Sequence, residues 1–169
     1  MFSLFRNSYK EIQNLGAAQE LEGTEFRYYP NLIKHLKKEN QSIIALYQDI
    51  DKARMKGNHE KIGRLLSHFG SELRGHLIHE HIKLYIYLKF ALKEQPENLA
   101  TLQKFRSEMM QIGKNITEFL SKYENCSWNN ELLNSFDNEF ERMGQVLIKR
   151  IQTEEEMLYP LYLPPSAYS

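Results

Sequence analysis

One pattern of side chains occurs twice in this chain and restricts its fold more than any other feature. Starting at Ile62, and again 74 residues later at Phe136, seven positions follow one another in steps of three and four. The first copy is Ile62, Leu66, Phe69, Leu73, His76, Glu80 and Leu84, and the second is Phe136, Phe140, Met143, Leu147, Arg150, Glu154 and Leu158. This spacing places all seven side chains on one face of an α-helix. Each copy therefore predicts a long helix whose inward stripe is apolar except for two polar residues.

Two other segments have helical spacing without a polar pair. Their apolar positions are Ile33, Leu36, Ile43, Tyr47 and Ile50 in one segment, and Leu102, Phe105, Met109, Ile112, Ile116 and Phe119 in the other. Pro30 and Pro96 suit the first turns of these helices, and Ser127 or Asn129 can cap the last helix of the chain. The predicted helices run over about 30–56, 59–92 and 96–123, and from the turn at 125–129 to about 159. Short turns between four such helices favour an all-α, up-down-up-down four-helix bundle.

The sequence predicts one domain with a short extension at each end. Residues 1–28 show no strong periodicity, and we expect a lead segment there that packs on the bundle. The bundle itself is expected over 29–163. The tail at 164–169 begins with two prolines and is expected to be extended.

Composition argues against several classes of function. Lysine plus arginine and aspartate plus glutamate both total 22, so the basic excess typical of nucleic-acid binding is absent. No run of apolar residues is long enough to span a membrane. A single cysteine, Cys126, cannot form an internal disulfide, which favours a cytoplasmic location. No serine hydrolase order, phosphate-binding glycine loop or CxxC pair occurs, so we expect a protein that is not an enzyme.

The polar pairs on the two stripes need a chemical explanation. Burying His76, Glu80, Arg150 and Glu154 is costly unless these residues satisfy one another or bind something. Residues four apart lie one helical turn from each other, so each helix offers a basic group beside a carboxylate at a similar depth. Helical bundles build metal sites in their cores in this way. The sequence therefore predicts a core polar network of these four residues.

Three motifs give the chain a family resemblance. Residues 75–80 (GHLIHE), 154–161 (EEEMLYPL) and 32–40 (LIKHLKKEN) resemble the hemerythrin-like, HHE cation-binding family. The resemblance covers about residues 30–162. It implies a four-helix bundle, and full members of the family hold two irons with five histidines and two carboxylates. Such members bind oxygen or sense iron or redox state.

Transferred position by position, the resemblance leaves only one histidine ligand. The helix-two pair of the family maps onto His76 and Glu80, and the helix-four carboxylate maps onto Glu154 or Glu155. The histidines of helices one, three and four map onto Asn40, Met109 and Arg150, with Glu108 next to Met109, and His35 is expected to face elsewhere. Arginine is always protonated and has no lone pair for a metal. We therefore expect no di-iron centre.

Two functions remain open. In the first, the protein is a non-catalytic binding or regulatory module without a cofactor, the charge of Arg150 neutralises Glu80 and Glu154, and the partner is a protein. In the second, the protein is a metal-binding protein in storage, sensing or oxygen and redox chemistry. A single iron or another divalent metal is then held by His76, Glu80, Glu154 and Glu108, with Asn40 or Glu39 filling a position. Four further histidines, His59, His68, His79 and His81, lie off the stripe and are expected to be solvated. Tyr85 and Tyr159 are expected to be ordinary core residues.

Overall fold

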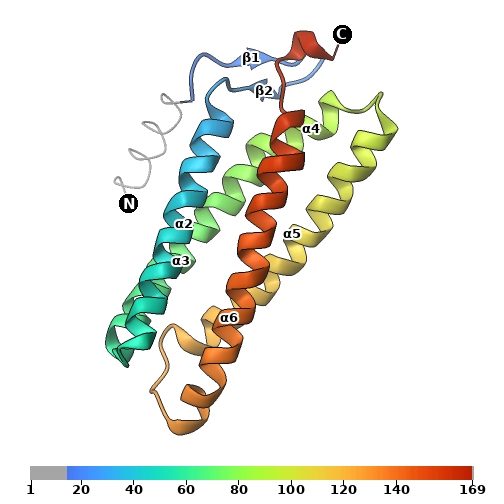
Figure 1. Cartoon of the computed structure of the whole chain (residues 1–169). Coiled ribbons are helices and arrows are strands. Elements are labelled where there is room, and N and C mark those ends of the chain that lie inside the picture. The colour runs from blue at the N-terminus through green and yellow to red at the C-terminus, as the bar shows by residue number, and fades with distance from the viewer. Residues whose placement is uncertain (1–14, 169) are drawn as a thin grey trace.

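Four long helices pack side by side in the computed structural model, which describes residues 15–168 (Figure 1). They are α2 (Leu32–Met55), α3 (His59–His79), α5 (Pro96–Tyr123) and α6 (Asn130–Thr153). The second helix continues through a π-helical turn, η1 (Glu80–Tyr85), into α4 (Ile86–Ala91). The fourth continues through a π-helical turn, η2 (Glu154–Leu158), into the 3₁₀ turn η3 (Tyr159–Leu161). The predicted all-α four-helix bundle is confirmed.

Local side chains explain where these helices begin. Asn58 and Asn129 cap α3 and α6, each accepting a hydrogen bond from the backbone N–H three residues later. Asn129, rather than Ser127, is therefore the cap of the last helix. Pro96 occupies the first turn of α5, as its sequence position predicts. The prediction for Pro30 is wrong, because α2 begins at Leu32, after the residue at its N-cap, Asn31.

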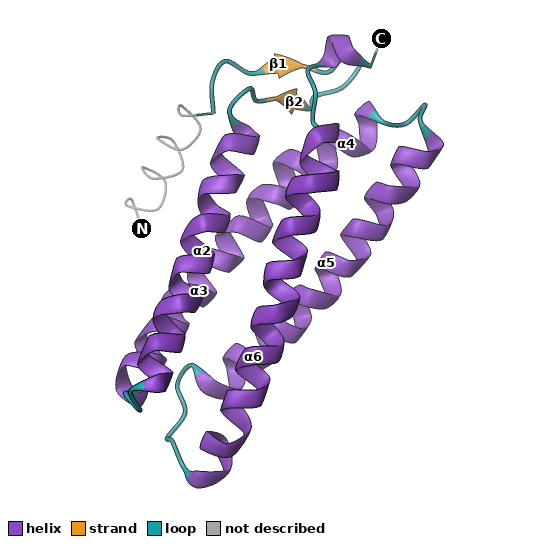
Figure 2. Ribbon diagram, in the orientation of Figure 1, coloured by secondary structure: helices purple, strands orange, loops and turns teal. Residues whose placement is uncertain are grey.

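A small hairpin covers one end of the bundle. Strands β1 (Gln19–Glu20) and β2 (Arg27–Tyr28) pair antiparallel and lie at the same end as the chain's C-terminus (Figure 2). The expected lead segment thus contains a hairpin, and residues 1–14 of it lie outside the described range.

The expectation of a fully extended tail is wrong. It contains the 3₁₀ turn η4 (Pro165–Ala167). The Tyr168 hydroxyl folds back on the chain, accepting from the Leu163 N–H and donating to the Leu161 carbonyl, and these bonds favour the turn.

The buried side chains form two apolar cores with a polar layer between them. The first core is built around Phe69, Phe136 and Phe140, and the second around Leu36, Tyr87 and Leu158. Between them lie five buried polar residues, which we call the polar layer: Asn40, His76, Glu80, Arg150 and Glu154. On each of the three helices that supply them, these residues interrupt a run of apolar positions. The fold therefore positions one polar site in the middle of an otherwise apolar interior.

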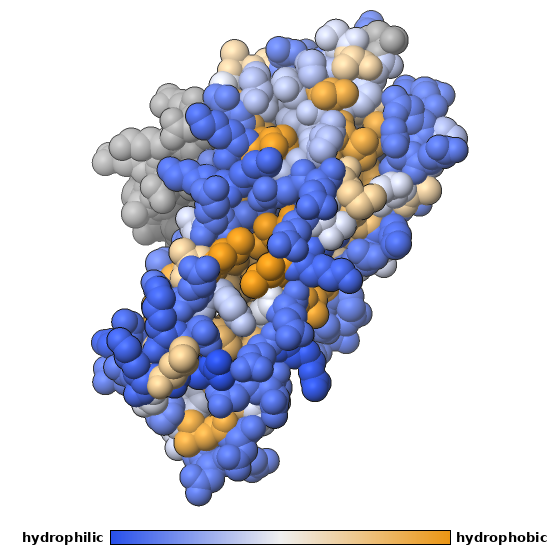
Figure 3. Space-filling model, in the orientation of Figure 1, coloured by the Kyte–Doolittle hydropathy of each residue, from blue (hydrophilic) through white to orange (hydrophobic). Residues whose placement is uncertain are grey.

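The visible surface is mostly hydrophilic. Figure 3 shows apolar residues between α2 and α6 and further patches at the upper right and near the lower end of the molecule. In the described part of the chain, each helix is too short or too polar to cross a lipid bilayer.

Candidate functional site

Both π-helical turns begin at a carboxylate of the polar layer. Glu80 opens η1 and Glu154 opens η2, at equivalent positions of the repeat. In an α-helix a residue five positions onward points about 140° away from the first. A π-helical turn holds more residues, and such turns are frequent at functional sites. Tyr85 and Tyr159, each five positions after its glutamate, are consequently both drawn to the polar layer.

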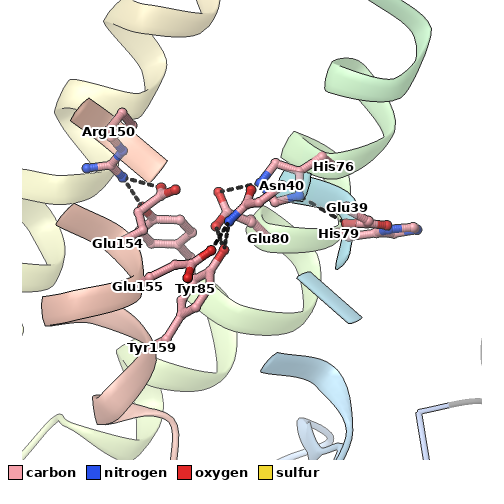
Figure 4. A network of polar contacts seen from close by, with 10 residues as sticks. All are labelled: Glu39, Asn40, His76, His79, Glu80, Tyr85, Arg150, Glu154, Glu155 and Tyr159. Atoms are coloured by element: carbon pink, nitrogen blue, oxygen red, sulfur yellow. Dashed lines mark hydrogen bonds and ion pairs between the residues drawn. The ribbon is translucent and has the colours of Figure 1, made fainter. Parts of the chain in front are cut away.

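The four residues of the predicted network lie close together in the interior (Figure 4). His76, Glu80, Arg150 and Glu154 are each 4% exposed or less. Asn40, from the neighbouring helix α2, is fully buried beside them. Of the two carboxylates considered for helix four, Glu154 points inward, whereas Glu155 is half-buried and accepts a hydrogen bond from Asn40 Nδ2 at 3.1 Å.

On the α6 side, Arg150 is paired within the core rather than at the surface. Its Nη2 lies 2.7 Å from Glu154 Oε1 and donates to the Tyr85 hydroxyl at 2.5 Å. Its guanidinium carbon lies 4.7 Å from the centre of the Phe105 ring. No hydrogen bond or ion pair joins Arg150 to Glu80, although the charge of Arg150 opposes the rise that burial causes in the pKa of Glu80, so of the two carboxylates only Glu154 pairs directly with the guanidinium. Arg150 sits one turn before Glu154 on the same helix and reaches that carboxylate first.

On the α3 side, His76 is held by a carboxylate from α2. Its Nδ1 lies 3.0 Å from Glu39 Oε2, and its Nε2 lies 3.8 Å from Glu80 Oε2. A hydrogen bond from Nδ1–H to Glu39 leaves the lone pair of Nε2 directed into the layer. Glu80 also accepts a hydrogen bond from the Tyr159 hydroxyl at 3.0 Å, and that hydroxyl accepts one from Asn40 Nδ2 at 3.3 Å.

Several buried polar atoms of the layer lack a hydrogen-bond partner. Among the described residues, all such side-chain atoms but one belong to it: Asn40 Oδ1, Glu80 Oε2, both carboxylate oxygens of Glu154, and Arg150 Nε and Nη1. Glu154 Oε1 meets Arg150 as an ion pair without hydrogen-bond alignment. Leaving such atoms unpaired is unfavourable in a protein interior. One ligand atom each from His76, Glu80 and Glu154 lie within 4.8 Å of one another, so an electropositive centre would satisfy several of them at once.

The pKa values of the glutamates in and beside the layer also favour an electropositive centre there. Burial raises the pKa of Glu80 to about 8, and the nearby Glu154 adds to the rise. Burial likewise raises the pKa of Glu154 to about 7, against the opposing charge of Arg150. For Glu39, burial opposes ionisation, but hydrogen bonds from His76 and His79 outweigh it and lower the pKa to about 2. Glu39 is therefore ionised, while the two core carboxylates favour a bound proton or cation.

Two other sequence candidates lie at the edge of this arrangement. Glu108 is 48% exposed, and its Oε2 lies 3.7 Å from Arg150 Nη1. It does not belong to the group formed by His76, Glu80 and Glu154. Met109 lines a small cavity that also borders His76 and Glu154.

The remaining histidines divide into two sets. His68 and His81 are exposed, as expected, whereas His59 is half-buried with its ring 5.3 Å from that of Trp128. The expectation for His79 is wrong: its Nδ1 lies 2.6 Å from Glu39 Oε1. His35 reaches the same carboxylate oxygen, with its Nε2 at 2.9 Å.

Sequence reasoning missed the roles of Tyr85 and Tyr159, which it assigned only to the core. Both are buried, but their hydroxyls bond Arg150 and Glu80. A signal for them exists, because the two tyrosines stand at the same 74-residue shift as the stripes. The position of Glu39 has no such signal, because it lies off the stripe of its helix.

A comparison with protein families decides the family of the chain. The model of the hemerythrin HHE cation binding domain matches residues 31–162. The chain belongs to this family. The match spans all four helices and both π-helical turns, so the polar layer of this hemerythrin-family bundle lies within the matched region. No curated protein and no solved structure matches the chain.

Proposed function

We propose that this hemerythrin-family bundle binds one divalent cation, such as iron or zinc, in its polar layer. In this proposal the cation is a structural or sensing element and does not carry oxygen. The observation that supports it is the convergence of His76, Glu80 and Glu154, whose ligand atoms lie within 4.8 Å of one another. Oxygen atoms of both glutamates there have no hydrogen-bond partner, so they remain available to a cation.

The surroundings of these donors support the proposal. Glu39 orients His76 through Nδ1, as outer carboxylates do for metal-binding histidines. Tyr159 orients Glu80 through Oε1, which leaves Oε2 for a cation. An imidazole nitrogen with two carboxylate oxygens is a donor set that iron and zinc accept.

Arg150 argues for one cation rather than two. Its guanidinium lies against Glu154 at 2.7 Å and stays protonated, so it repels a second metal there and cannot bind one. The charges also balance with a single divalent cation. Glu39, Glu80 and Glu154 are then neutralised by that cation together with Arg150. The residues present therefore fit one cation and do not fit a di-iron centre.

When bound, the cation would supply a positive charge that holds α3, η1 and η2 together. Its protein donors come from the second and fourth helices, and Glu39 links them to the first. Because cation binding to the folded state alone stabilises that state, the bundle would be more stable with the cation than without it. A cation-dependent change in stability is the basis of a sensing or regulatory role.

The test is thermal unfolding of the full chain, purified without a histidine tag and stripped with a chelator. At about 100 times the dissociation constant, a cation stabilises by about 2.7 kcal/mol, which corresponds to a rise of about 5–11 °C in Tm. We expect this rise with Fe²⁺ under anaerobic conditions or with Zn²⁺. In a His35→Gln, His79→Gln background, which removes the histidines outside the layer that could also hold a cation, Glu80→Gln with Glu154→Gln should abolish it, and Glu108→Gln, outside the donor group, should keep it. No rise in the unmodified chain, or an unchanged rise in the double variant, would refute the proposal.

A second candidate function is favoured by one specific observation. The contacts from Arg150 to Glu154 and Tyr85 already supply a charge to the layer without a metal. In this alternative the layer holds a proton in place of a cation, and the bundle acts as a metal-free module that binds a protein partner. It predicts no cation-dependent rise in Tm, and a partner that is recovered equally by chelated and untreated protein.

A further inference from the structure

A second group of metal-ligand side chains lies outside the polar layer, between α2 and α3. It consists of His35, Glu39 and His79, whose ligand atoms lie within 4.8 Å of one another. The three side chains are 24%, 19% and 21% exposed, so they are accessible to solvent without being fully solvated. Both histidines direct a ring nitrogen at the same atom, Glu39 Oε1.

We propose that His35, Glu39 and His79 form a second site for a divalent cation of the zinc class, separate from the core. The ligands would be His35 Nε2, Glu39 Oε1 and His79 Nδ1. Two imidazoles with one carboxylate, leaving a further position for water, make a common zinc donor set. Nothing in the proposal for the polar layer requires this site, so the two stand or fall separately.

The geometry needs only a small adjustment to accept the ion. Two ligands bound tetrahedrally at about 2.0 Å from zinc lie roughly 3.3 Å apart. His35 Nε2 lies 2.9 Å and His79 Nδ1 lies 2.6 Å from Glu39 Oε1, so the first distance would lengthen by about 0.4 Å and the second by about 0.7 Å. Rotation of three partly exposed side chains accommodates such a change. The proton that His79 Nδ1 shares with the carboxylate would leave to solvent as the ion binds.

One contact is better explained by an ion than by a hydrogen bond. His35 Nε2 is buried and close to Glu39 Oε1, yet it is not aligned to make a hydrogen bond. The two imidazole rings are inclined at 56° with their centres 5.7 Å apart, which lets their nitrogens converge on the carboxylate without stacking.

Glu39 connects this outer site with the core. Its Oε1 faces the outer histidines, and its Oε2 accepts from His76 Nδ1 at 3.0 Å. An ion at the outer site would therefore act on His76 through the shared carboxylate, while the ligand atoms of the two sites remain different. Substitution of Glu39 would affect both sites, so the test below leaves it unchanged.

The test measures Zn²⁺ binding by equilibrium dialysis of the full chain, with the core ligands removed by Glu80→Gln and Glu154→Gln. We expect this variant to bind one Zn²⁺ per chain. Adding His35→Gln and His79→Gln should weaken the binding by at least the roughly 100-fold seen when supporting residues of metal sites are lost. Adding His68→Gln and His81→Gln, two exposed histidines outside the group, should change nothing. Zn²⁺ binding that survives the loss of His35 and His79, or that is absent while both are present, would refute the outer site.

A second measurement uses the unmodified chain and so does not depend on the stability of any variant. Modification of histidines by diethyl pyrocarbonate, located by mass spectrometry, should be slowed at His35 and His79 by Zn²⁺ and unchanged at His81. Equal modification of all three histidines with and without saturating Zn²⁺ would also refute the outer site. A positive result here together with a negative result for the core site would leave this inference intact and refute only the proposed function.

Discussion

The two copies of the repeat build similar halves of one site, and they differ in the residue that precedes the glutamate. The first copy has His76, Glu80 and Tyr85, and the second has Arg150, Glu154 and Tyr159. His76 is oriented by Glu39 through Nδ1, and its Nε2 faces Glu80 in the layer. Arg150 instead offers a permanent positive charge to its own glutamate at 2.7 Å. The first copy therefore offers two potential metal ligands. In the second copy, the positive charge of the arginine already neutralises the glutamate.

The tyrosines show that the two halves depend on each other. Tyr85 of the first copy accepts a hydrogen bond from Arg150 of the second. Tyr159 of the second copy donates one to Glu80 of the first. Each copy is thus completed by a phenol from the other. The difference between histidine and arginine acts on a shared network rather than on two separate helices.

The largest expected effect comes from removing the charge of the second copy. Arg150→Leu should destabilise the chelated protein by about 3–5 kcal/mol, because Glu154 is left as a buried charge without its partner. Glu154→Gln should rescue much of this loss, and Glu80→Gln should rescue less, because Arg150 contacts Glu154 and not Glu80. Urea unfolding at neutral pH measures all three variants. A loss below about 0.5 kcal/mol, the scale of a surface substitution, would contradict the pairing.

The two tyrosines should differ in the size of their effects. Tyr85→Phe removes a hydrogen bond to a charged group and should cost about 1.5–3 kcal/mol. Tyr159→Phe removes a bond to a carboxylate whose raised pKa favours its neutral form, and should cost about 0.5–1.5 kcal/mol. Urea unfolding of the chelated variants at neutral pH gives both values, and Tyr29→Phe, at a partly buried tyrosine packed against the second apolar core, is the control. A larger cost for Tyr159→Phe would reverse the assignment of charge between the halves.

The first copy should also control how stability depends on pH. The folded chain holds a proton on Glu80 more tightly than the unfolded chain does, since its pKa is raised from 4.5 to about 8. Without metal, stability is therefore greatest near pH 5 and falls as pH rises toward 8, by about 1.4 kcal/mol per pH unit for one proton. Glu80→Gln should remove this part of the dependence and leave the part due to Glu154, whose pKa burial raises to about 7.

Glu39 should act in the opposite sense and in a different pH range. Its pKa is lowered from 4.5 to about 2, so its contribution is present above pH 4.5 and is lost as pH falls toward 2. Unfolding curves of the chelated chain and of Glu80→Gln between pH 3 and 8 measure both effects. Stability that rises between pH 5 and 8 would contradict the raised pKa of Glu80.

Periodicity predicts the helices of this chain well because their boundaries coincide with strong local signals. Pro96 and Asn129 mark the starts of α5 and α6 where the sequence places them. The hairpin was not predictable from alternation, because each strand is only two residues long. The start of α2 was predicted too early from Pro30, because a proline that fits the first turn of a helix also fits the loop before it.

Within the site, the stripe predicts the residues that share a helix face and misses those that arrive by other means. His76, Glu80, Arg150 and Glu154 follow from the stripe. Tyr85 and Tyr159 join the layer because each helix widens at a π-helical turn, which an α-helical period cannot represent. Glu39 and His79 meet across two helices, and a contact between helices leaves no periodic trace in either one.

The central claim is that the polar layer holds one cation because the second copy carries arginine. The most direct measurement is the number of core cations per chain, determined by elemental analysis in a His35→Gln, His79→Gln background, which removes the outer site. We predict one cation in that chain, and a second one, or at least a clear gain in affinity, when Asn40→His and Arg150→His are added. Two cations before those changes, or none in either chain, would contradict it.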